Sequence, residues 1–264
     1  MMAQEEFMNQ YLSSVSLKSL AKGQLLGKYG TAIGALLLHM ICFSPLSFAI
    51  TTAIGTNTLP TIFIYSIALF ILQLFNGYFR VGQIYISLKI ACNQTPSVKD
   101  LFHFFRGDSS KLISIQAVLG GVYVLCNLPL LIVQHYVNRS ITHYDINALN
   151  EGQLPVNAAL FLTYALLYVA NLVIVIYVRY LLLSQAFFLM LDFPEYSASQ
   201  LLKMSIQLMK GSKGRLLYLR LSFIPLLFLG LFSCGIALLW IIPYINTTLA
   251  NFYLDLIKKK NQSS

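Results

Sequence analysis

Six long apolar stretches limit what this 264-residue chain can fold into. They span about residues 29–54, 61–90, 112–134, 158–191, 216–233 and 235–256. One helix needs roughly 18 to 20 apolar residues to cross a bilayer core about 30 Å thick, and each stretch is about that long or longer. Only 10% of the residues are charged, whereas a soluble domain has about a quarter. The sequence therefore predicts an all-α, polytopic membrane protein with six transmembrane helices.

Basic residues gather in every second connection between these stretches. The basic segments are those at 1–28, 99–111, 203–215 and 257–264. The 137–157 connection instead holds Arg139 with two acidic residues. Because basic connections stay in the cytosol, both termini are predicted to be cytosolic. Of the 18 lysines and arginines, Arg139 alone is expected outside.

This orientation divides the chain into three parts. We expect a cytosolic amphipathic segment, a single six-helix membrane domain and a cytosolic basic tail, at residues 1–28, 29–256 and 257–264. The excess of basic charge suits the anionic lipids of the inner leaflet of a plasma membrane and requires no nucleic acid.

The combined length of the last two apolar stretches shows whether they cross the membrane once or twice. Arg220 and Asp255 enclose 34 uncharged residues, which as a helix would extend about 51 Å, too long for one bilayer core. Two crossings fit, and Ser233, Cys234 and Gly235 offer a turn of small residues between them. A single crossing would also leave the terminal lysines outside, against the charge rule. We therefore expect the chain to return to the cytosol.

The six spans are predicted to form three pseudo-repeated hairpins, each preceded by a short amphipathic segment. These elbow segments read "LKSLAKGQLLGK", "VKDLFHFFRGDSSK" and "ASQLLKMSIQLMKGSK". In the third, one helical face would carry Leu201, Leu202, Ile206 and Met209. Such a face is typical of a helix lying in the membrane interface. An ordinary solvated linker is the alternative.

Two arginine–proline pairs with nearly the same spacing also support an internal repeat. Arg80 lies 16 residues before Pro96, and Arg179 lies 15 residues before Pro194. Each pair encloses an apolar helix extension that a proline ends. Repetition of landmarks in the same order indicates duplication, although two apolar helices can also resemble each other by chance.

Arg80 and Arg179 are the candidate ligand-binding residues, because each is a charge within a predicted span, near its inner end. In one interpretation their side chains reach the lipid headgroups individually and only anchor the helices. In the other they form a shared site for a lipid headgroup or another anion, since the planar arginine fork binds phosphate through two hydrogen bonds.

Other polar residues within the spans are His39, Asn76, Asn127 and Asn171. Such groups usually form hydrogen bonds between helices and fix their packing, and a role in function is the alternative. Pro243 is predicted to break the last span, and Asn246 and Thr247 could satisfy the backbone groups that it frees.

Chemical motifs are missing from the sequence. The nine acidic residues all lie in loops, tails or span ends. An ion-coupled carrier commonly uses a carboxylate at mid-membrane, so this placement disfavours that class of protein. The four cysteines lie far apart, without a CxxC pair, and no metal site or cofactor is expected. No HExxH, GxSxG or Walker motif occurs. An enzyme is therefore the least favoured class.

Three stretches carry a resemblance to a known family: "LKSLAKGQLLGKYGTAIGALLL", "SIQLMKGSKGRLLYLRLSF" and "GIALLWIIPYINTTLANFY". In these stretches the chain resembles a bacterial family, mainly from Gram-positive organisms, known as domain of unknown function 975. More distantly, it is similar to the six-helix membrane domain of some glycerophosphodiester phosphodiesterases. Neither resemblance implies a catalytic residue.

Two functions remain open at this point. The first is a non-catalytic protein of the cytoplasmic membrane that binds anionic phospholipids or a partner, either another membrane protein or a second copy of the chain. The alternative is a transporter or channel for a small solute or peptide, which the repeated architecture and the long spans would suit.

Overall fold

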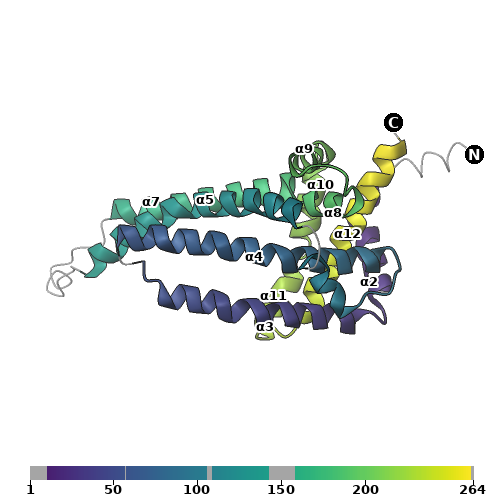
Figure 1. Ribbon diagram of the computed structural model, residues 1–264, viewed down its shortest axis with the longest axis horizontal. Helices are drawn as coiled ribbons and strands as arrows, with labels where there is room; N and C mark the ends of the chain where they lie inside the picture. Colours follow the sequence, from purple (N-terminus) through teal and green to yellow (C-terminus); the bar gives the residue numbers. More distant parts are fainter. Residues whose placement is uncertain (1–10, 57, 106–108, 143–157, 263–264) are drawn as a thin grey trace, which may run out of the picture. The chain divides into compact units, whose positions relative to one another are not determined.

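The computed structural model describes residues 11–56, 58–105, 109–142 and 158–262. All the regular elements in these ranges are helices (Figure 1). Helices long and apolar enough to cross a membrane cover Tyr29–Ala53, Leu59–Ala91, Ser110–Arg139, Phe161–Asp192 and Lys213–Phe232. These ranges agree to within a few residues with the first five predicted spans. The protein is an all-α, polytopic membrane protein.

The sixth predicted stretch forms helix α12, Leu238–Gln262, which is not among these five. Its polar residues explain the difference, because they interrupt the apolar run. Thr247 and Thr248 are fully buried and Asn251 is 6% exposed. Helix α12 thus turns a polar face toward the protein.

The chain forms two compact units. Unit 1 comprises Met1–Cys42, Asn76–Ile115 and Leu181–Ser264, and unit 2 comprises Phe43–Phe75 and Gln116–Tyr180. All described lysines and arginines belong to unit 1, except Arg139 and Arg179. Most of the basic residues that the structure describes therefore belong to unit 1.

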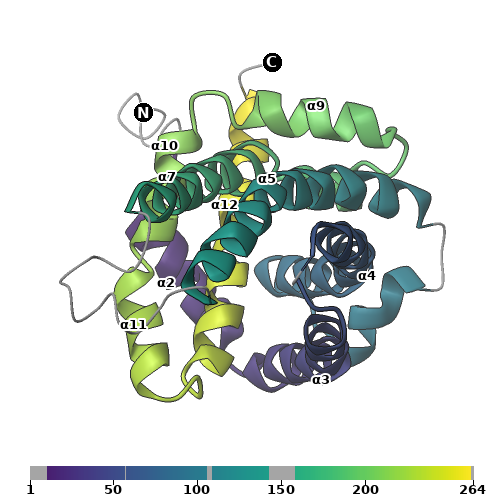
Figure 2. The ribbon, with the colours of Figure 1, turned by 90° about the vertical axis from the view of Figure 1, so that its left-hand side faces the viewer.

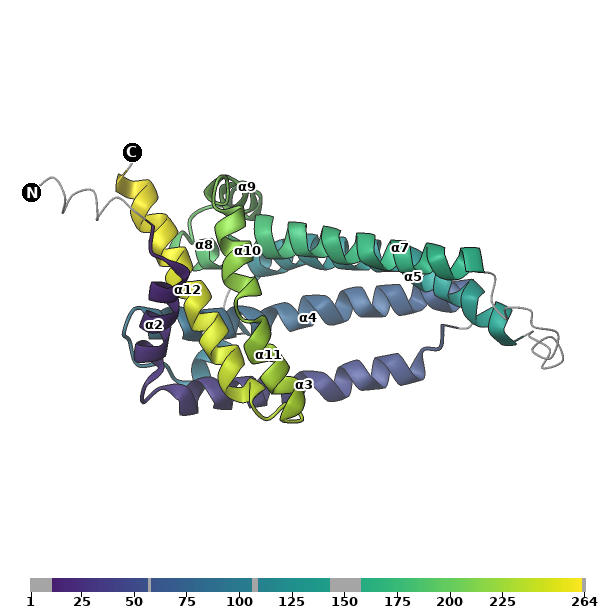
Figure 3. The ribbon, with the colours of Figure 1, turned by 180° about the vertical axis from the view of Figure 1, so that it is seen from behind.

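In unit 1, helix α2, Ser14–Leu25, lies beside α12 (Figures 2 and 3). Its first turn is capped by Ser13, whose hydroxyl accepts a hydrogen bond from the backbone N–H of Ser16 at 3.1 Å. Leu17, Ala21 and Leu25 recur every fourth residue and are fully buried. The first elbow segment is therefore an amphipathic helix whose apolar face packs on protein.

The second elbow segment contains the 3₁₀ helix η1, Val98–Phe105. Its Leu101 is fully buried. Gly82 on helix α4, Leu59–Ala91, permits this approach, because a β-carbon there would overlap the backbone of Leu101. The glycine is needed here for space.

The third elbow segment forms helix α9, Ala198–Leu208, which packs on α8, Ala186–Asp192. A capping box of Ser197 and Gln200 begins it. The predicted apolar face was only partly right: Leu201 and Met209 are buried, but Ile206 is 43% exposed. Ser205 takes part in the buried face instead, because its hydroxyl donates to the Leu182 carbonyl at 2.9 Å.

The fifth predicted span consists of α10, Lys213–Leu221, and α11, Ile224–Phe232. A turn follows in which Cys234 and Gly235 both have positive φ, 51° and 87°. Glycine adopts this conformation without strain. Helix α11 then packs against α12. The predicted turn of small residues lies at this place.

Unit 2 is built from parts of α3, Tyr29–Ala53, α4 and α5, Ser110–Thr142, together with α7, Ala158–Val175. Its large apolar side chains are extensively exposed. Examples on α4 and α7 are Phe63, Ile64, Ile67, Phe161, Leu162 and Leu166, each more than half exposed. An apolar surface of this extent is unfavourable in water and suits contact with lipid chains.

Candidate functional site

Among the charged residues of unit 2 that the structure describes, Arg179 is buried and Arg139 is exposed. Arg179 lies in the π-helix η2, Ile176–Leu182, which follows α7 directly. Only 8% of the residue is exposed. Its guanidinium lies over the ring of Tyr123 on α5, 5.3 Å from the ring centroid. This geometry permits a cation–π interaction.

Part of the hydrogen-bonding capacity of Arg179 is unused in the part of the chain that the structure describes. Its Nε is enclosed and has no acceptor. The described residues of unit 2 include no aspartate or glutamate. Arg179 is thus a buried cation with an aromatic neighbour but no described counter-charge in its own unit.

Arg80, the other predicted arginine, lies on α4 and is half-buried. Its guanidinium lies 5.8 Å from the ring centroid of Phe187 on α8. Both arginines therefore contact an aromatic ring. Arg80 belongs to unit 1 and Arg179 to unit 2, and the shared site for one anion stays a prediction.

His39 and Asn76, two of the predicted polar residues, are hydrogen-bonded to each other across α3 and α4. His39 Nε2 and Asn76 Oδ1 are 3.0 Å apart. The other ring nitrogen, Nδ1, is 2.9 Å from Nε2 of Gln83, and the imidazole stacks on Phe79 with 5.0 Å between centroids. Sequence reasoning missed Gln83, although its spacing of seven from Asn76 puts both on one face of α4.

Asn127 and Asn171 form a second pair, in unit 2. The side-chain nitrogen of Asn171 donates to Oδ1 of Asn127 at 3.4 Å, and Asn127 donates to the carbonyl of Tyr123 at 2.7 Å. Among the described groups, Oδ1 of Asn171 has no partner. This pair joins α5 and α7 a few turns from Arg179.

Pro243 lies within α12, which continues as a helix to Gln262. Pro243 and Asn246 line a small hollow together with Gln83 and Ser87 of α4. Its volume is about 10 Å³, roughly the space that one water molecule needs. Among the described atoms, the buried hydroxyl of Thr247 has no hydrogen-bond partner. Two of the predicted helix-break residues, Pro243 and Asn246, thus line a hollow of water size, although the helix is continuous there.

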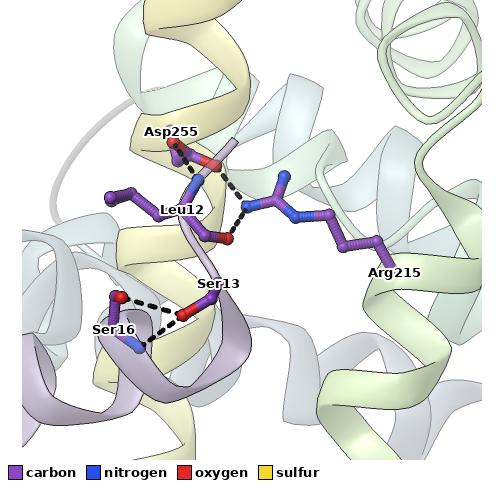
Figure 4. A network of polar contacts seen from close by, with 5 residues as sticks. All are labelled: Leu12, Ser13, Ser16, Arg215 and Asp255. Carbon is purple, nitrogen blue, oxygen red and sulfur yellow. Dashed lines mark hydrogen bonds and ion pairs between the residues drawn. The ribbon is translucent and has the colours of Figure 1, made fainter. Parts of the chain in front are cut away.

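A polar network ties the N-terminal segment to α12 (Figure 4). Arg215 on α10 donates to the carbonyl of Leu12 at 2.8 Å and forms an ion pair with Asp255. Asp255 also accepts from the backbone N–H of Leu12 at 3.3 Å. Sequence reasoning missed this network, because residues so far apart in the chain give no pattern.

Lys18 adds a further contact between α2 and the break after α10. Its ammonium donates to the Ser222 carbonyl at 2.9 Å and lies 4.2 Å from the ring centroid of Phe223. Burial lowers the pKa of Lys18, because removal from water disfavours the charged form. The contact is structural, since neither neighbour is a reactive group.

The comparisons with known proteins identify a family that is described as of unknown function. Within the described ranges, no group of His, Cys, Asp or Glu side chains could hold a metal ion. No curated protein and no solved structure matches the chain. The family described as protein of unknown function (DUF975) matches residues 8–260, nearly the whole chain. The protein belongs to the DUF975 family.

Proposed function

We propose that this protein is a non-catalytic component of the cytoplasmic membrane that binds anionic phospholipids through unit 1. The observation that carries the proposal is the placement of the exposed lysines. These are Lys22, Lys99, Lys203, Lys210, Lys258 and Lys260, all in unit 1. In the described part of unit 2, the exposed basic residue is Arg139. Basic charge is thus concentrated in one unit.

The structure describes four carboxylates in unit 1, of which Glu195 is exposed. Three of them have protein partners: Asp100 is held by Lys89, Asp255 by Arg215 and Asp192 by the hydroxyl of Tyr253. These three carboxylates are therefore already engaged and are not available to the exposed lysines. Each lysine near an anionic bilayer surface contributes about 1 kcal/mol of attraction, so six together favour anionic over neutral lipid.

Six spans with both termini in the cytosol would place these lysines on one side of the membrane. The turn at Cys234 and Gly235 and the packing of α11 on α12 support a third hairpin. The positive φ of Gly27 and of Gly211, 76° and 84°, also supports repeated elbow segments, because each glycine lies near the end of an elbow helix.

Lipid binding can be tested by native mass spectrometry. The protein is exchanged into nanodiscs with equal amounts of phosphatidylcholine and phosphatidylglycerol, and the lipids retained after gentle release are counted. We expect an excess of phosphatidylglycerol on the wild type. The double variant Lys203→Gln/Lys210→Gln should retain fewer, whereas Arg139→Gln, the matched control in unit 2, should not differ. Equal retention of both lipids by the wild type would contradict the proposal.

Transport of a small solute is the second candidate, and the interruption of the fourth span by the π-helix η2 favours it. Broken helices form the substrate sites of many transporters. The hollow beside Pro243 does not supply a path, because about 10 Å³ holds only a water molecule. Flux of labelled solutes into proteoliposomes, compared with empty liposomes, would test this function.

A further inference from the structure

We propose that Arg179 is the centre of a binding site for one phosphate group, carried by a phospholipid or present as free inorganic phosphate. The site lies in unit 2 and consists of Arg179 held over Tyr123. It goes beyond the attraction of the exposed lysines to an anionic surface, because it would bind one anion in a defined geometry.

The first step is the energetic cost of burying the charge of Arg179 without an anionic partner. A charged side chain buried without a counter-charge is strongly unfavourable, and it is rare within membrane spans unless it has a function. Arg179 is 8% exposed and its Nε has no acceptor among the described groups. A cation–π contact with Tyr123 offsets only part of the lost hydration. An additional anionic partner would offset the rest.

The second step is that the described residues of unit 2 do not provide this partner. Its two carboxylates, Asp145 and Glu151, lie outside the described residues. Three carboxylates of unit 1 are already bound by their own partners. A ligand is therefore the natural source of negative charge.

The third step concerns the geometry that Tyr123 imposes. A ring that stacks on a guanidinium occupies one face of the ion, whereas its N–H donors point outward in its plane. Two neighbouring donors of the guanidinium, either Nε with one terminal nitrogen or the two terminal nitrogens, form a fork. A fork of parallel N–H groups matches two oxygens of a phosphate. The geometry thus selects an oxyanion over a single-atom anion.

The fourth step concerns the π-helix that carries Arg179. Segment η2 covers Ile176–Leu182, with Arg179 at its centre. A π-turn is rare compared with an α-turn and occurs frequently at functional sites. Simple anchoring in the headgroup region needs no such distortion, and it would leave the arginine exposed. The burial of Arg179 argues for a held ligand.

The experiment compares the wild type with Arg179→Met in nanodiscs of phosphatidylcholine. In one arm, phosphatidylglycerol is titrated in phosphate-free buffer and bound lipids are counted by native mass spectrometry. In the other arm, no anionic lipid is present, and inorganic phosphate is titrated while the unfolding temperature is followed. Arg139→Met, an exposed arginine of the same unit, is the control.

We expect Arg179→Met to lose one bound phosphatidylglycerol, or the rise in unfolding temperature with phosphate, and Arg139→Met to retain both. The arm that responds identifies the source of the phosphate. Arg179→Lys should bind about tenfold more weakly, because an ammonium lacks the fork. Since Arg179→Met removes a buried charge, it should remain folded without the ligand. If wild type and Arg179→Met respond equally in both arms, or neither responds, the site does not exist.

Discussion

Asn251 on α12 donates a hydrogen bond of 2.7 Å to the side-chain oxygen of Gln24 on α2. The amide nitrogen of Gln24 in turn donates to the carbonyl of Ala91, at the end of α4, at 2.8 Å. One side chain thus connects three segments of unit 1 that are far apart in the sequence. Because both ends of the Gln24 amide are used, this contact specifies how α2 lies along α12.

The first prediction is that Gln24→Leu destabilises unit 1. Leucine fills a similar volume but leaves the amide of Asn251, which is 6% exposed, without its acceptor. An unsatisfied buried polar group costs about 1–3 kcal/mol. The unfolding temperature of the purified protein in detergent should fall accordingly, and protease should cut more readily in the segment before α2.

A matched control for this prediction is Gln207→Leu. Gln207 lies on α9 and is exposed, so the same substitution removes no buried contact. Its unfolding temperature should stay close to that of the wild type. The double variant Gln24→Leu/Asn251→Leu should lose less stability than the two single variants together, because it leaves no orphaned amide. Additive losses would show that the two side chains do not interact.

The second prediction concerns the close approach of α4 to η1. In Gly82→Ala, the added β-carbon would overlap the backbone of Leu101, which a side-chain rotation cannot relieve. We expect a loss of about 1–3 kcal/mol, typical of an overpacked site. The loss would appear as a lower unfolding temperature and as increased cleavage near residues 98–105.

Gly23→Ala serves as the comparison for Gly82→Ala. A β-carbon at Gly23 would meet nothing within 4 Å, and the residue lies within helix α2. Alanine favours a helix over glycine by roughly 0.5–1 kcal/mol. Gly23→Ala should therefore raise the unfolding temperature slightly. The same decrease in both variants would mean that the approach of Leu101 is not the cause.

The spans could be predicted from the sequence because their signal is local. A helix crossing a bilayer needs about 20 apolar residues in succession, and Tyr29–Ala53 shows this without knowledge of any partner. In α12, Thr247 and Asn251 lower the apolar signal, since they face protein instead of lipid. The sequence could not show which helix faces are surrounded by lipid and which by protein.

Of the proposed phosphate site, only the arginine could be predicted from the sequence. Arg179 attracts notice as an arginine in an apolar stretch, but nothing in the sequence pairs it with Tyr123. The π-helix has no hydropathy signal, because one extra residue in a turn leaves the composition unchanged. Likewise, the sequence predicted that the segment before the first span is amphipathic, but not that α12 lies beside the helix it forms. These features depend on contacts between distant segments.

The third prediction tests whether α12 crosses the membrane, using cysteines as reporters. Cys92, after α4, and Cys234, before α12, are both exposed. Six spans with a cytosolic N-terminus place Cys92 inside and Cys234 outside. Gln262→Cys, at the end of α12, adds a reporter that six spans place inside and five spans place outside. Each reporter is studied alone, with the other cysteines replaced by serine.

A membrane-impermeant maleimide applied to intact cells should therefore label Cys234 but neither Cys92 nor Gln262→Cys. The latter two should react only after permeabilisation. Desolvation, and then the charge of Asp192, raise the pKa of the Cys92 thiol, so less thiolate is present at neutral pH and its reaction should be slow. Labelling is therefore followed to completion in permeabilised cells as the reference for each site. If Gln262→Cys reacts from outside as fully as Cys234, α12 does not cross the membrane, and the lysines at 258–260 cannot contribute to lipid binding on the cytosolic side.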